Sequence, residues 1–118
     1  MDSNNKLLIA LYGHYLVMKT FHFQTASGFR HTKVDEYIVK YLANLDRLME
    51  VIQGIDSVVT IKDIHVRVTA HNDENIMEEV GRMIKHLETQ RDEEPSVNAI
   101  LDQMQGDLQQ LAYVFRFQ

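Results

Sequence analysis

Five residues in the first half of the chain have the types and the spacing of a metal site. His31 and Asp35 are four residues apart, Asp46 and Glu50 repeat that spacing eleven residues later, and His22 precedes them all. Residues four apart lie on one face of an α-helix, so each pair is a possible two-ligand clip. Imidazole and carboxylate ligands suit iron(II) and also accept zinc or manganese. The pattern therefore predicts a metal site at His22, His31, Asp35, Asp46 and Glu50.

The two clips cannot serve one metal ion from a single helix, because they lie roughly 16 Å apart along its axis. Two copies of the helix packed antiparallel about a two-fold axis remove this difficulty. With the axis close to Lys40 and Tyr41, His31 faces Glu50 of the partner subunit, and Asp35 faces Asp46 of the partner subunit. An isologous homodimer would then contain two equivalent shared sites, each completed by His22 from the first helix.

Apolar periodicity and breaks predict an all-α chain with a single domain over 1–118, with helices at about 5–24, 30–54, 73–92 and 96–116. Asn4 or Asn5 is expected to cap the first helix and Ser96 the fourth, and Ser27 with Gly28 ends the first. The first helix carries two apolar rows, which indicates two packing surfaces, one of them against another subunit. These rows are Leu11, Tyr15, Met18 and His22, and Ile9, Leu16 and Phe23.

The stretch from about 57 to 70 is rich in β-branched residues, which by propensity alone favours a strand. Since no second strand is available to pair with it, we interpret it as an extended crossover. Two helical hairpins joined by one long crossover constitute a ferritin-like four-helix bundle.

The order His22, His31, Asp35, Asp46 and Glu50 resembles the inter-subunit ferroxidase centre of the Dps mini-ferritins, most closely from about Tyr15 to Gly54. The resemblance implies that the histidines and Asp35 come from one subunit, and the second clip from its two-fold mate. It also implies iron(II) binding, oxidation by peroxide or dioxygen, and storage of ferric product in a hollow, usually dodecameric shell. Phe23 stands where that family often has tryptophan, and the basic tails that some members use on DNA are missing.

Composition excludes other classes of site and partner. The chain has no cysteine, so a thiolate metal site is excluded. Its net charge of -5, with no basic tail, argues against nucleic acid as a partner. Neither a membrane span nor a cleavable leader is recognisable, so the expected setting is the cytoplasm, with no membrane partner.

Two other functions remain open from the sequence. One is a non-catalytic ferritin-like dimer that binds a structural metal or acts as an interaction module, and the other is a plain helical partner-binding protein. Glu78 and Glu79 are expected to interact with a helix dipole, and His14 to be structural or on the surface. Two further groups have no expected role in a site. The methionines at 18, 49, 77, 83 and 104 are expected in the core, and His65, His71 and His86 on the surface.

Overall fold

The computed structural model describes residues 2–56, 73–91 and 94–117, with side chains from residue 6 onward. It contains four helices: α1 (Asp2–Gln24), α2 (Gly28–Asp56), α3 (Ile76–Thr89) and α4 (Pro95–Phe115). No β-strand occurs within these described ranges, so the all-α prediction is confirmed there.

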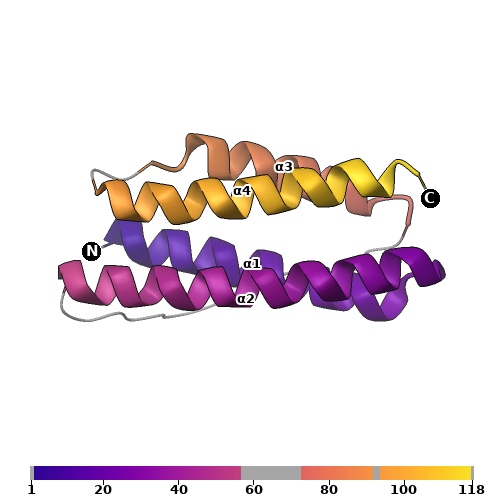
Figure 1. The fold of residues 1–118 in the computed structure, drawn as a ribbon, viewed down its shortest axis with the longest axis horizontal. Coiled ribbons are helices and arrows are strands. Elements are labelled where there is room, and N and C mark those ends of the chain that lie inside the picture. The colour runs from indigo at the N-terminus through magenta and orange to yellow at the C-terminus, as the bar shows by residue number, and fades with distance from the viewer. Residues whose placement is uncertain (1, 57–72, 92–93, 118) are drawn as a thin grey trace.

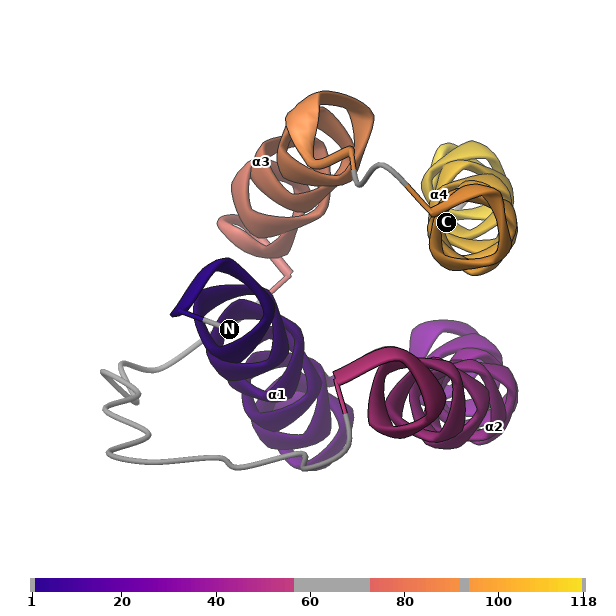
Figure 2. The ribbon, with the colours of Figure 1, turned by 90° about the vertical axis from the view of Figure 1, so that its left-hand side faces the viewer.

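The helices lie side by side in an elongated four-helix bundle measuring 43 × 26 × 22 Å (Figure 1). Seen end-on, the order around the bundle is α1, α2, α4 and α3 (Figure 2), with α2 packed between α1 and α4. Successive helices run in opposite directions within each hairpin, whereas α2 ends and α3 begins at opposite ends of the bundle. The predicted crossover over 57–70 lies outside the described residues.

Apolar residues at helical spacing form the core, as the periodicity predicted for α2 and α4, except that Leu42, predicted in the apolar row of α2, is exposed. Fully burying one such side chain stabilises the fold by about 1.5–3 kcal/mol, so these two rows supply much of the driving force. The buried row of α2 contains Val34, Ile38, Tyr41, Leu45, Leu48 and Ile52, and that of α4 contains Val97, Ile100, Leu101, Met104, Leu108, Leu111 and Phe115.

The helix ends differ from the predicted ones by a few residues. Helix α1 begins at Asp2 rather than after an Asn4 or Asn5 cap, and α3 occupies only 76–89 of the predicted 73–92. Ser96 is not the cap of α4, since Glu94 has that position and Pro95 starts the helix. Proline suits a first helical position because the backbone N–H that it lacks has no partner there.

Candidate metal centre

The two predicted histidine ligands meet where α1 turns into α2. We call residues 22–31 the α1–α2 corner. His22 lies in the last turn of α1 and His31 in the first turn of α2, and their rings stack with centroids 3.9 Å apart. Nδ1 of His31 lies 2.8 Å from the backbone oxygen of His22. Since a carbonyl only accepts hydrogen bonds, Nδ1 carries the proton, and in the neutral ring Nε2 of His31 keeps its lone pair.

His22 is buried, yet neither of its ring nitrogens has a hydrogen-bond partner among the described residues. Its Nε2 lies 3.6 Å from a carboxylate oxygen of Asp35, which is too far for a good hydrogen bond. Burial lowers the pKa of His22, and the charges of His31 and Lys19 lower it further while Asp35 opposes them. The imidazole is therefore neutral near pH 7, the state in which nitrogen can bind a metal ion.

The structure thus brings His22, His31 and Asp35 together in one chain, but their arrangement does not form a ready metal site. Among the described residues, no group of three or more histidine or acidic side chains could hold a metal ion as placed. The His22 and His31 rings are only 25° from parallel, and their in-plane lone pairs do not converge on one point. Binding through both rings requires one imidazole to rotate.

Asp46 and Glu50 are exposed and lie further along α2. They belong to one exposed row of α2, which we call the outer row: His31, Asp35, Val39, Leu42, Asp46 and Glu50. Its centre is apolar, with Val39 67% and Leu42 38% exposed. Leu16 and Phe23 of α1 are exposed as well, in agreement with the second apolar row expected there, whereas Leu11, Met18 and His22 of the first row are buried.

A buried polar network crosses the core, and the sequence pattern did not predict it. His14 is fully buried; its Nδ1 lies 2.8 Å from Oε2 of Glu79 and its Nε2 2.9 Å from the hydroxyl of Tyr37. Arg82 donates two hydrogen bonds to the same Glu79 carboxylate. The network therefore joins α1, α2 and α3, and the prediction that Glu79 interacts with the helix dipole omits its main partners.

Charge in this network follows from burial and hydrogen bonding. Burial lowers the pKa of His14, against the opposing effect of Glu79. Burial alone would raise the pKa of Glu79, but the hydrogen bonds from His14 and Arg82, together with the Arg82 charge, outweigh it and lower that pKa. Burial, together with Asp107 and Glu79, raises the pKa of Tyr37 well above its ordinary value. A neutral His14 therefore donates to an ionised Glu79 and accepts from Tyr37.

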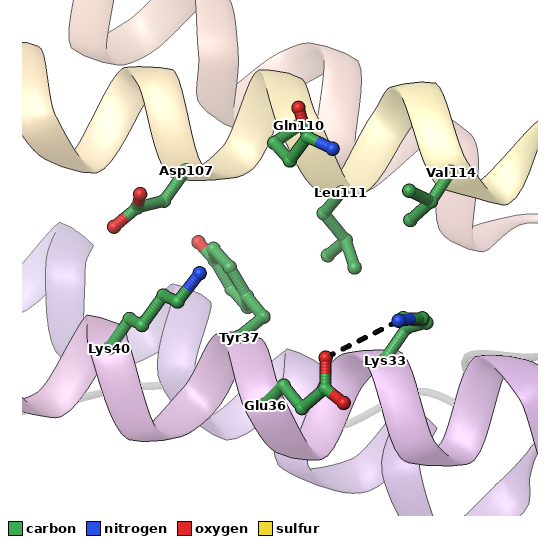
Figure 3. Close-up of a pocket in the computed structure, with 8 residues that line it drawn as sticks. All are labelled: Lys33, Glu36, Tyr37, Lys40, Asp107, Gln110, Leu111 and Val114. Atoms are coloured by element: carbon green, nitrogen blue, oxygen red, sulfur yellow. Dashed lines mark ion pairs between the residues drawn. The ribbon is translucent and has the colours of Figure 1, made fainter.

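Tyr37 also lines a shallow pocket of about 160 Å³ between α2 and α4. In Figure 3 the Tyr37 ring extends from α2, and its hydroxyl points toward the space between Lys40 and Asp107. Both signs of charge occur along the pocket, where Lys33 and Glu36 form an ion pair of 3.5 Å. Its lining contains none of the five predicted metal ligands.

The other predicted residues have simpler positions. Met18, Met83 and Met104 are buried and Met49 and Met77 partly so, which confirms them as core. His86 is only partly exposed, contrary to the surface prediction, and burial lowers its pKa. His65 and His71 lie outside the described residues. None of the helices in the described ranges is long and apolar enough to span a membrane.

Comparisons of the chain with protein-family models, curated proteins and solved structures find no match.

Proposed function

We propose that this protein is a Dps-like mini-ferritin that binds iron(II), oxidises it with peroxide or dioxygen, and stores the ferric product. In this proposal the bundle has the ferritin-like connection of its hairpins. His22, His31 and Asp35 of one chain bind iron together with Asp46 and Glu50 of the partner subunit. Zinc or manganese can occupy the same ligands. Dimers would assemble further into a closed, dodecameric shell.

The observation that carries the proposal is the buried His22 imidazole without a hydrogen-bond partner. Burying a polar group with no partner costs free energy, so such groups in folded proteins generally have a role. Here the orphan nitrogens lie beside a stacked second histidine and 3.6 Å from a carboxylate. A metal ion bound at this corner would give the His22 nitrogen the partner that residues 2–56, 73–91 and 94–117 do not provide.

The outer row of α2 supports the shared site. An antiparallel pairing centred between Lys40 and Tyr41 places Val39 against Leu42 of the partner subunit, so the exposed apolar residues bury each other. The same pairing aligns His31 and Asp35 with the acidic clip of the second chain, at both ends of the row. The apolar contact would hold the dimer while the polar ends of the row bind iron.

In the proposed reaction iron(II) is the substrate and hydrogen peroxide is the oxidant. Two iron(II) ions each lose one electron, the O–O bond of hydrogen peroxide breaks, and two protons complete two water molecules. The three carboxylates Asp35, Asp46 and Glu50 stabilise the higher charge of the ferric product, and His22 and His31 donate nitrogen lone pairs. The neutral state of His22 follows from its burial.

Anaerobic loading with iron(II) followed by peroxide tests the activity. Wild-type protein is expected to develop ferric absorbance rapidly, and the Asp46→Ala, Glu50→Ala double variant is expected to lose this reaction. Glu36→Ala with Glu88→Ala is the matched control, because it removes two exposed carboxylates away from the outer row. Equal rates in the double variant and the wild type would exclude these residues from the reaction.

Mixing subunits tests whether the site is shared. A His31→Ala, Asp35→Ala chain and an Asp46→Ala, Glu50→Ala chain each lack half of every site, so their homodimers should bind no metal. Their heterodimer contains one complete site, because one chain supplies the intact His31 and Asp35 clip and the other the intact Asp46 and Glu50 clip. It is expected to bind about half the wild-type metal. Verified heterodimers that bind no metal would contradict the shared site.

The second candidate is a non-catalytic dimer that acts as an interaction module or holds a structural metal. The near-parallel His22 and His31 rings favour the interaction module, because their lone pairs do not converge on one point. A structural metal would raise the melting temperature by mass action without ferric absorbance appearing. A melting temperature unchanged by iron, zinc and manganese would instead favour a plain interaction module.

A further inference from the structure

The carboxylate of Asp73 ties the α1–α2 corner to the segment before α3. Oδ1 of Asp73 accepts a hydrogen bond of 2.6 Å from the hydroxyl of Thr25, and Oδ2 accepts one of 3.3 Å from the backbone N–H of Ala26. Asp73 lies just before α3, far from the corner in sequence. Both halves of its carboxylate therefore bind the short connection between the two helices that carry His22 and His31.

The contact continues into the first turn of α2. Oγ1 of Thr25 accepts a hydrogen bond from the backbone N–H of Ser27, and Oγ of Ser27 accepts one from the backbone N–H of Arg30. The latter is the bond of an N-cap residue, and it fixes where α2 begins. The backbone N–H of His31 then donates to the carbonyl of Ser27 at 2.9 Å. A continuous series of hydrogen bonds thus runs from Asp73 to the backbone of His31.

Arg30 reinforces the same connection from the core side. Its guanidinium is buried, donates to the backbone oxygens of Asp73 and Phe115, and lies 3.7 Å from the Asp73 carboxylate. The start of α2, the segment before α3 and the end of α4 are therefore held together at one point. A change at Asp73 would loosen the α1–α2 corner without removing any of the five proposed iron ligands.

We propose that Asp73 is a positioning residue for the iron(II) site. It fixes the α1–α2 corner, so that Nδ1 of His31 stays bonded to the carbonyl of His22 and Nε2 of His31 stays available to the metal. This role rests on the proposed function, since it concerns the same ligands. Outer groups that orient metal ligands typically change metal affinity by about 10–100-fold when removed.

Cobalt(II) titration, followed by its visible absorption, measures the effect on affinity. Asp73→Ala is expected to weaken cobalt binding by about tenfold, and Asp73→Asn, which keeps an acceptor for Thr25, is expected to recover most of it. The control is Ile100→Val, a mild core change in the first half of α4, which should bind cobalt like the wild type. The start of α4 and the α1–α2 turn lie at opposite ends of the bundle (Figure 1). If Asp73→Ala does not fold, Thr25→Val replaces it, with weaker binding still expected.

The His31 tautomer is a second readout that needs no metal. Long-range ¹⁵N–¹H spectra of the apoprotein near pH 8 should show the proton of His31 on Nδ1 in the wild type. Asp73→Ala, or Thr25→Val in its place, should shift it toward Nε2, whereas Ile100→Val should not. If Asp73→Ala, or Thr25→Val in its place, binds cobalt as tightly as the wild type and keeps the His31 proton on Nδ1, the positioning role is overturned. Absence of cobalt binding by the wild type would instead overturn the proposed function, and the tautomer would still decide whether Asp73 orders the corner.

Discussion

Replacement of His14 by glutamine should reduce the acid sensitivity of the fold. The folded protein keeps His14 neutral because burial lowers its pKa, whereas the unfolded chain protonates an ordinary imidazole below about pH 6.5. Below that pH the unfolded state binds more protons, so the free energy of unfolding falls as the pH falls. The effect is absent above the ordinary pKa and approaches about 1.4 kcal/mol per pH unit for one histidine below it.

The assay is urea unfolding followed by circular dichroism between pH 7.5 and 5, with a chelator present so that bound metal adds nothing. Burial also lowers the pKa of His22 and of His86, so the wild type and the His14→Gln variant both lose stability on acidification. The difference between the two curves of unfolding free energy against pH therefore gives the contribution of His14. Glu79, with its lowered pKa, loses its contribution only at lower pH, which keeps it out of this window.

His14→Gln keeps an amide donor for Glu79 but cannot titrate. We expect the variant to be less stable near neutral pH by about 1–2 kcal/mol, because imidazole bridges two partners and the amide does not reproduce both bonds. The wild type should lose up to about 1 kcal/mol more than the variant between pH 6.5 and 5.5, because the unfolded imidazole is only half protonated at the upper end of this range. Parallel curves over this range would refute the claim that the core holds His14 neutral.

Three further predictions concern stability and assembly. Glu79→Leu should cost about 3 kcal/mol in urea unfolding, because it leaves the buried His14 N–H without an acceptor, whereas Glu79→Gln should cost less than about 1.5 kcal/mol. Arg30→Met should cost about 2–3 kcal/mol, because the buried carbonyl of Phe115 and the partly buried carbonyl of Asp73 lose a charged donor, and Arg30→Lys should recover part of it. Val39→Asp with Leu42→Asp should yield folded monomers in sedimentation, because the exposed centre of the outer row is the proposed dimer contact.

Each of these has a contradicting outcome. Equal stability of the leucine and glutamine variants at Glu79 would mean that the His14 bond contributes nothing. An Arg30→Met protein as stable as the wild type would show that the carbonyls find other donors. Dimers that persist with aspartate at Val39 and Leu42, but dissociate on Tyr113→Asp, would move the contact to the exposed aromatic residues at the end of α4.

Within the described parts of the chain, the sequence by itself determined the number and the approximate extent of the helices. Apolar residues recur every three or four positions along α2 and α4, and burial of such a row is the main force that packs a helix, so the row can be read without coordinates. The same periodicity indicated that His31 and Asp35 share a face, as do Asp46 and Glu50. Helix ends were less accurate, since a proline at position 95 and local hydrogen bonds decide them.

Only the tertiary structure decided which residues from different helices meet. His14 lies on the buried face of α1, and Glu79 among the buried residues of α3, yet nothing in their local sequences indicates that they bond to each other. Asp73 likewise reaches Thr25 across a long separation in sequence. Periodicity specifies the face of one helix, whereas a contact between helices depends on their relative rotation and register. Packing of the whole bundle sets both, and it therefore decides which polar side chains become partners in the core and at the α1–α2 corner.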